Sequence, residues 1–180
     1  MAQRNEQLSE AVENLGDKAT FAEGWRVLHQ GGNHAVAAAR EGLSHPNPRV
    51  RQWCAGFIDA HWDESALQRL ILSLHDPKLK VRKAAVHSLG CDRCKSGQNP
   101  IDVLPHLEER IREDKSIKVR RMAVQTIAAQ TPNRRIARIL RRALRDQSDP
   151  KIRRFAQWGL KRYQDACSSE KAKGVIDEPK

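Results

Sequence analysis

The sequence predicts an all-α protein, a solenoid of stacked helical hairpins, and three observations support this fold class. Four segments contain an aliphatic residue followed by Arg, and these pairs recur at intervals of 31, 38 and 33 residues. A small residue and a second aliphatic residue follow at four and eight positions, which is the spacing of one helical face. An amphipathic stretch precedes each segment, so each unit has two helices. The four pairs are Val50-Arg51, Val81-Arg82, Val119-Arg120 and Ile152-Arg153.

Four hairpins of this kind occupy residues 33–163. Their first helices are predicted at 33–43, 64–75, 101–113 and 133–144, and each second helix begins near its aliphatic-Arg pair. Residues 1–32 lack the repeat pattern but have helical spacing, so we expect an N-terminal helical cap over the otherwise exposed first repeat. Residues 164–180 have little periodicity and mixed charge, so we expect a disordered C-terminal tail.

The pattern D-x4-V-R-x2-A-x3-L at 76–89 and, with Ile in the last position, at 114–127 resembles the HEAT repeat family, especially the short bacterial HEAT-like repeats also found in phycobilisome lyase subunits. The resemblance covers residues 33–163 and implies a right-handed α-α superhelix of the armadillo-like helical class, used as a binding scaffold. It also implies that Arg82 and Arg120 pair with the corner Asp of their own or the next repeat. His45 replaces that Asp in the first repeat, and Asp146 lies one position early in the fourth, so we expect these two corners to be built differently.

The charge of the chain is concentrated in the repeats. The 33 Lys and Arg exceed the 22 Asp and Glu by 11. Residues 49–163 carry 26 basic and 12 acidic residues, whereas residues 1–48 carry 4 and 6, and residues 164–180 carry 3 and 4. This excess predicts an acidic partner. The sequence has no apolar run near the length of about 18 residues that a membrane span needs and no secretory signal, so we expect a cytoplasmic protein without membrane contact.

The predicted binding surface follows the second helices, which in a HEAT-like stack line the concave side. Basic residues recur one position before and two positions after the aliphatic residue of the pair, and an aromatic residue follows at the C-terminal end. These candidates are Arg49, Lys80, Lys83, Lys118, Arg121, Lys151, Arg154 and Trp158. Capping of the last repeat is the alternative role for Trp158. Six arginines within residues 134–145 lie on a first helix, which offers the outer face as an alternative polyanion site.

The favoured function is a non-catalytic scaffold that binds an acidic protein partner through a basic concave groove. A nucleic-acid-binding module is the alternative, and a DNA-glycosylase-like enzyme is less favoured. The sequence contains no nucleophile elbow, phosphate-binding glycine loop or HExxH motif. Enzyme activity stays open, although the lack of these motifs favours a binding role. The identity of the partner and the oligomeric state are also open.

The sequence GCDRCKSGQNP between the second and third repeats contains a CxxC pair. Cys91 follows a predicted helix end at Gly90, where the helix dipole disfavours a thiolate, so redox catalysis is not expected. Small cysteines that pack the loop, with no cofactor, are the favoured interpretation. A zinc clip made by His87, Cys91 and Cys94 is the alternative, with a fourth ligand from His106 or solvent.

Overall fold

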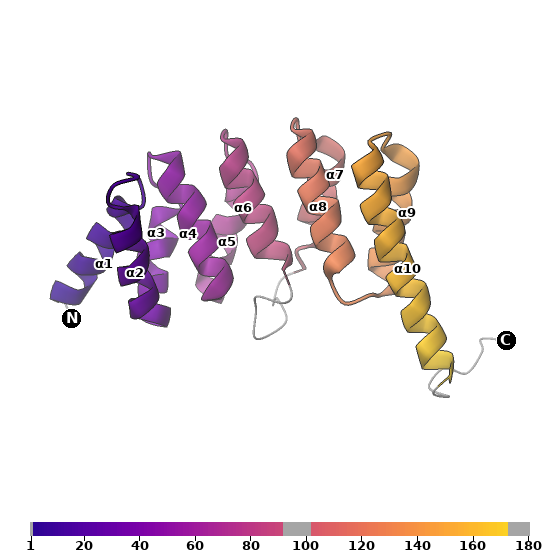
Figure 1. The fold of residues 1–180 in the computed structure, drawn as a ribbon, viewed down its shortest axis with the longest axis horizontal. Coiled ribbons are helices and arrows are strands. Elements are labelled where there is room, and N and C mark those ends of the chain that lie inside the picture. Colours follow the sequence, from indigo (N-terminus) through magenta and orange to yellow (C-terminus); the bar gives the residue numbers. More distant parts are fainter. Residues whose placement is uncertain (1, 92–101, 173–180) are drawn as a thin grey trace. The chain divides into compact units, whose positions relative to one another are not determined.

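A computed structural model describes residues 2–91 and 102–172, and these residues contain helices and no strand (Figure 1). They form two compact units, one ending at His106 and the other beginning at Leu107. The elements before the boundary are α1 (Ala2–Asn14), α2 (Phe21–Gly31), a 3-10 turn (Gly32–Ala35), α3 (Val36–Gly42), α4 (Pro48–Ala60), a second 3-10 turn (Glu64–Ala66), α5 (Leu67–Ser73) and α6 (Leu79–Gly90). α7 (Leu104–Glu113) spans the boundary, and α8 (Ile117–Ala129), α9 (Arg134–Asp146) and α10 (Pro150–Ala172) complete the second unit.

The N-terminal unit is built around α4 and α6, which pack side by side (Figure 1). α3 packs against α4 and α5 packs against α6. The predicted core positions of both second helices are fully buried: Val50, Cys54, Ile58, Val81, Ala85 and Leu89. The predicted core positions are therefore confirmed in this unit. They share one helix face because a turn of 3.6 residues brings positions zero, four and eight to the same side.

Helix α2 packs against α4 of the first repeat through contacts between aromatic rings. The ring centroids of Phe21 and Trp53 are 4.7 Å apart, and those of Trp25 and Trp53 are 5.6 Å apart. Trp25 also lies edge-on to Phe57, which is fully buried. These contacts cover apolar surface on α4 that water would otherwise reach.

The C-terminal unit packs both α8 and α9 against α10. Val119, Ala123, Ile127, Ile152 and Ala156 occupy the predicted core positions and are fully buried. The last predicted core residue of this unit, Leu160, is only partly buried.

Helix α10 extends further than the sequence predicted. We expected disorder from residue 164, but α10 continues to Ala172. The reason is local, because residues 164–172 contain no Gly or Pro and the first Gly after them is Gly174. Residues 173–180 lie outside the described part of the chain.

Each repeat turns between its two helices at a corner where one side chain accepts a hydrogen bond from the backbone two residues ahead. Asp76 Oδ1 accepts from the Lys78 N–H at 2.8 Å, and Asp114 Oδ1 accepts from the Ser116 N–H at the same distance. The first corner is built differently, as expected, because His45 Nδ1 accepts from the Asn47 N–H at 3.0 Å.

In the fourth corner the acceptor is Asp149 rather than Asp146, the residue that the sequence pattern singled out. Asp149 Oδ1 accepts from the N–H groups of Lys151 and Ile152 at 3.1 and 3.0 Å. Asp149 therefore caps the start of α10, as Asp and Asn side chains commonly do at helix N-termini.

Candidate functional site

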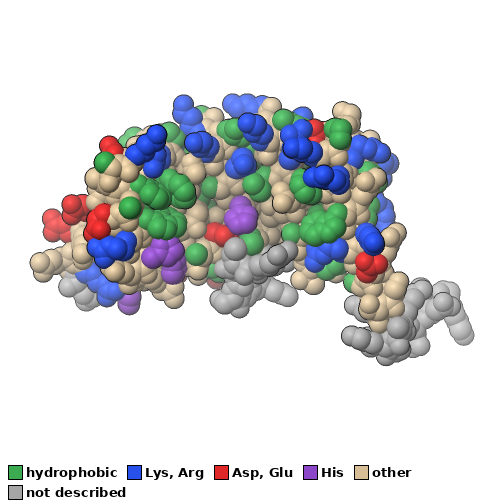
Figure 2. Space-filling model, viewed as in Figure 1, with side chains coloured by type: hydrophobic (Ala, Val, Ile, Leu, Met, Phe, Trp, Pro, Cys, Tyr) green, Lys and Arg blue, Asp and Glu red, His purple; other side chains and the backbone are tan. Residues whose placement is uncertain are grey.

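The C-terminal unit presents basic side chains at equivalent positions of two neighbouring helices. Lys118 is the second residue of α8, and Lys151 is the second residue of α10. Arg154 and Trp158 follow Lys151 by three and seven positions, which keeps them on one face of α10. We call Lys118, Lys151, Arg154 and Trp158 the basic face. All four are exposed, and Figure 2 shows Lys and Arg gathered over the N-terminal ends of α8 and α10.

Arg121 occupies the same surface of α8 but has a partner within the fold. Its Nε lies 3.0 Å from Asp149 Oδ1, and its Nη2 lies 2.6 Å from Oδ2, which is a bidentate ion pair. The hydrogen bond from Arg121 lowers the pKa of the Asp149 carboxyl to about 2. Arg121, predicted as a partner-binding residue, therefore links α8 to the corner before α10.

Trp158 is held in place by a neighbouring arginine. The side chain is 42% exposed, and the Arg162 guanidinium lies 5.2 Å from the ring centroid. Arg162 also donates from Nη1 to the carbonyl oxygens of Ala128 and Gln130 at 2.5 and 3.0 Å. The end of α8 thus fixes Arg162, which in turn orients an exposed indole ring.

The N-terminal unit contains the other three predicted binding residues. Arg49 donates from Nε to the Leu15 carbonyl oxygen at 3.1 Å and lies 5.3 Å from the Phe21 ring centroid, so it ties the first repeat to the N-terminal helices. Lys80 is exposed and Lys83 is half-buried. Lys83, Arg121 and Arg154 occupy the same position in three successive repeats, which predicts a line of charge if the repeats stack regularly. Lys83 belongs to one unit and the two arginines to the other, so this line stays a prediction.

Helix α9 carries a second concentration of charge. Arg134, Arg138, Arg141 and Arg145 are all exposed and recur at intervals of four, three and four residues, so they form one stripe along the helix. With Arg142 and Tyr163 they line a hollow of about 320 Å³. The Arg141 guanidinium lies 5.9 Å from the Tyr163 ring centroid, and Arg142 forms an ion pair with Glu108 of α7.

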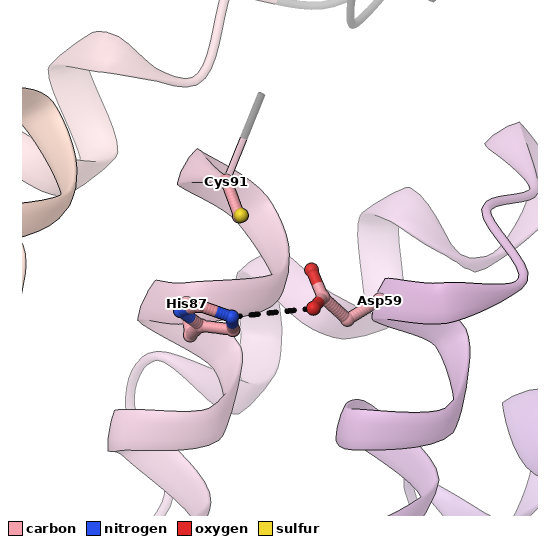
Figure 3. Close-up of side chains that lie close together, drawn as sticks. All are labelled: Asp59, His87 and Cys91. Carbon is pink, nitrogen blue, oxygen red and sulfur yellow. Dashed lines mark ion pairs between the residues drawn. The ribbon is translucent and has the colours of Figure 1, made fainter. Parts of the chain in front are cut away.

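Three potential metal ligands meet in the N-terminal unit (Figure 3). A carboxylate oxygen of Asp59, a ring nitrogen of His87 and Sγ of Cys91 all lie within 4.8 Å of one another. His87 Nε2 is 3.2 Å from Asp59 Oδ2. The sequence predicted His87 and Cys91 for a zinc clip, whereas Cys94 lies outside the described residues.

Asp59 was missed by sequence reasoning. It lies in the last turn of α4 and is 7% exposed. A carboxylate is unfavourable at this end of a helix, where the macrodipole is negative. An acidic residue directly after the apolar pair Phe57 and Ile58 was therefore a signal that a cationic partner lies on a neighbouring element.

No helix of the part of the chain that the structure describes has the length and hydropathy needed to cross a membrane.

Comparisons with known proteins identify the repeats. Residues 104–179 match the family model of HEAT repeats. No curated protein matches the chain. A designed armadillo repeat protein in complex with the peptide (KR)4 is similar in structure, with a TM-score of 0.52 and 17% identity over 87% of this chain and 81% of that chain. Similarity at this identity establishes the fold alone. Residues 104–179 thus resemble HEAT repeats, and the chain has the all-α repeat solenoid fold.

Proposed function

We propose that the protein is a binding scaffold that holds an acidic protein segment on the basic face of its C-terminal unit. The observation that carries this proposal is a set of exposed cations that form no ion pair within the described part of the chain. Lys118, Lys151 and Arg154 have no ion-pair partner among residues 2–91 and 102–172. The nearby carboxylate of Asp149 is already engaged by Arg121, so it does not neutralise them.

The positions of the two lysines support an external partner. Lys118 and Lys151 are each the second residue of a helix, where the positive end of the macrodipole disfavours a cation. An anion brought to this edge would interact favourably both with the ammonium groups and with the helix N-termini. The lysines therefore reduce stability slightly in the free protein and gain a favourable interaction in a complex.

Trp158 favours a protein segment over an anion alone. An exposed indole that a neighbouring guanidinium keeps in one orientation resembles the aromatic anchors of protein interfaces. We infer that the bound segment carries an apolar side chain next to its acidic residues. The designed repeat protein of similar fold holds a (KR)4 peptide, whereas the cations here favour the opposite charge.

The proposal is tested with a fluorescent peptide of alternating acidic residues and leucine, and with a (KR)4 peptide as the charge-reversed control. A Lys118→Glu/Lys151→Glu/Arg154→Glu variant should weaken binding of the acidic peptide by about tenfold or more, because exposed contacts of about 0.2–1 kcal/mol each become repulsions. Trp158→Ala should weaken binding of the leucine-containing peptide more than binding of a peptide with serine in place of leucine.

A matched control is Arg134→Glu/Arg138→Glu/Arg141→Glu, which changes the net charge equally on α9. The proposal expects this control to keep most of the affinity for the peptide, since only long-range attraction is lost and salt screens it. Equal loss of affinity in both triple variants would contradict a localised site on the basic face.

The α9 stripe supports a second candidate function, the binding of single-stranded nucleic acid. Four exposed arginines in a row beside Tyr163 combine phosphate contacts with an aromatic ring on which a base could stack. A DNA oligonucleotide is the probe, and the logarithm of its affinity should fall with the logarithm of salt concentration with a slope of about −3 if four phosphates are neutralised. The α9 triple variant should abolish this binding, and the basic-face variant should retain it.

A further inference from the structure

We propose that Asp59, His87 and Cys91 form a zinc site that joins the C-terminal ends of α4 and α6. This inference is independent of the proposed binding of an acidic partner. The proposed ligands are the three side chains of this group. Two of them, His87 and Cys91, were predicted from the sequence, and the third, Asp59, was not. Cys94 is not counted among the ligands.

The three residues converge because of their places on two packed helices. Asp59 lies in the last turn of α4, and α4 packs side by side with α6. His87 lies in the last turn of α6, and Cys91 follows it by four positions, which brings both side chains to the same side of the helix (Figure 3). Cys91 is held there by its N–H, which donates to the His87 carbonyl oxygen at 2.9 Å.

The distances suit a metal ion. Zinc binds oxygen and nitrogen at about 2.0–2.2 Å and sulfur at about 2.3 Å, so its tetrahedral ligands lie about 3.5 Å from one another. The three ligand atoms already lie within 4.8 Å of one another, and the nitrogen and oxygen are 3.2 Å apart. Small side-chain rotations bring them to coordination distances. A water molecule would complete a four-coordinate site.

The donor set indicates the kind of metal. One thiolate, one imidazole and one carboxylate form a borderline-soft set, which suits Zn²⁺ rather than the oxygen-binding Ca²⁺ or Mg²⁺. The charges of one thiolate and one carboxylate balance the two charges of the ion. The complex is therefore neutral, which matters because Asp59 is largely buried.

The helix termini add to the attraction for a cation. α4 and α6 both end at this place, so both direct the negative end of their macrodipole toward the three side chains. An ionised Asp59 and a thiolate at Cys91 would be unfavourable here without a cation. His87 Nε2 lies 3.2 Å from Asp59 Oδ2, and zinc bound between the two side chains would supply two positive charges.

The other described cysteines are separate from this group and serve as comparisons. Cys54 is completely buried, burial raises the pKa of its thiol to about 12, and it is not part of the group of potential ligands. Cys167 lies on α10 in the other unit and is partly exposed. His75 is an exposed histidine of the N-terminal unit outside the group. Cys167→Ser and His75→Gln are therefore matched controls.

The experiment titrates metal into the full-length, metal-free, reduced protein. We expect one zinc ion per chain, measured by competition with a chromophoric chelator. Co²⁺ should give a thiolate-to-cobalt charge-transfer band that zinc abolishes. Zinc at about 100-fold above its dissociation constant should raise the melting temperature by about 5–10 °C.

Cys91→Ser should remove the charge-transfer band and weaken zinc binding at least tenfold, and His87→Gln and Asp59→Asn should weaken it similarly. The two control variants should bind as the wild type does. If Asp59→Asn fails to fold, Cys91→Ser and His87→Gln still decide the question, because their side chains are only partly buried or exposed. Zinc binding that is unchanged in Cys91→Ser, or a cobalt complex without a charge-transfer band, would overturn the proposal.

Discussion

Arg51 is expected to hold the first two repeats together, and its replacement by alanine tests this role. Its Nε and Nη2 lie 2.6 and 3.0 Å from the two carboxylate oxygens of Asp76 in the next repeat. Its Nη1 donates to the carbonyl oxygens of His45 and Pro46 at 2.7 and 3.0 Å. One guanidinium thus joins the corner of its own repeat to the corner of the following one.

The magnitude follows from what Arg51→Ala leaves behind. The Asp76 side chain is only 8% exposed, so its carboxylate would lose two charge-assisted hydrogen bonds with limited access to water. Breaking a buried pair costs about 3–5 kcal/mol, and an exposed pair about 0–1 kcal/mol. Asp76 keeps its bond from the Lys78 N–H, and the Pro46 carbonyl is open to solvent. We therefore expect a loss of about 2–3 kcal/mol in the free energy of unfolding.

Urea unfolding followed by tryptophan fluorescence measures this loss, because three of the four tryptophans lie in the N-terminal unit. With a slope of about 2 kcal/mol per molar urea, the midpoint should fall by about 1–1.5 M. Arg51→Lys should recover only part of the loss, since an ammonium cannot make the bidentate contact. Lys80→Ala, an exposed control, should change stability by less than about 0.5 kcal/mol. Coinciding midpoints for Arg51→Ala and Lys80→Ala would refute the reasoning.

Three further predictions concern single groups. Arg121 lowers the pKa of Asp149 from 3.8 to about 2, so this pair stabilises the fold above pH 4 and its contribution is lost as the pH falls from about 4 to 2. Arg121→Ala should therefore make the free energy of unfolding, measured by urea unfolding, depend less on pH in this range. Burial and a raised pKa should leave Cys54 unmodified when native protein is treated with iodoacetamide, as mass spectrometry of the digest can establish; labelling at the rate of the exposed thiols would contradict its burial. Gly159→Ala should destabilise by about 1–3 kcal/mol because the new Cβ would lie 2.5 Å from a side-chain atom of α9, whereas Gly56→Ala, with nothing within 4 Å, should stabilise slightly in the same thermal melts.

The repeat core could be predicted from sequence because it depends on one period within one helix. Positions zero, four and eight of each second helix are determined by the 3.6-residue turn, and apart from the last of them, Leu160, all are fully buried or nearly so. The end of α10 was mispredicted because weak periodicity was taken as a sign of disorder. The absence of helix breakers was the better guide there.

The corner pairs were harder to predict because they depend on the register between helices of successive repeats. Asp76 precedes the aliphatic residue of its repeat by five positions, and the arginine that reaches it is the one directly after Val50. Asp149 precedes the aliphatic residue of its repeat, Ile152, by only three positions. The arginine that reaches Asp149 is Arg121, which lies two positions after the aliphatic residue of the preceding repeat rather than directly after it. A shift of the Asp along the corner therefore changes which arginine is structural, and no pattern within one repeat contains that information.

The two ends of the second helices have opposite chemistry, and the macrodipole explains both. At the N-terminal ends, backbone N–H groups and arginines already hold the carboxylates of Asp76 and Asp149. An acidic segment that approached Lys118 and Lys151 would meet the same combination of helix N-terminus and cation that binds carboxylates within the fold. At the C-terminal ends of α4 and α6, the side chains that come together are potential ligands for a cation, Asp59, His87 and Cys91. The proposed anion site and the proposed metal site are thus consistent with a single physical cause, the parallel alignment of second helices within each unit.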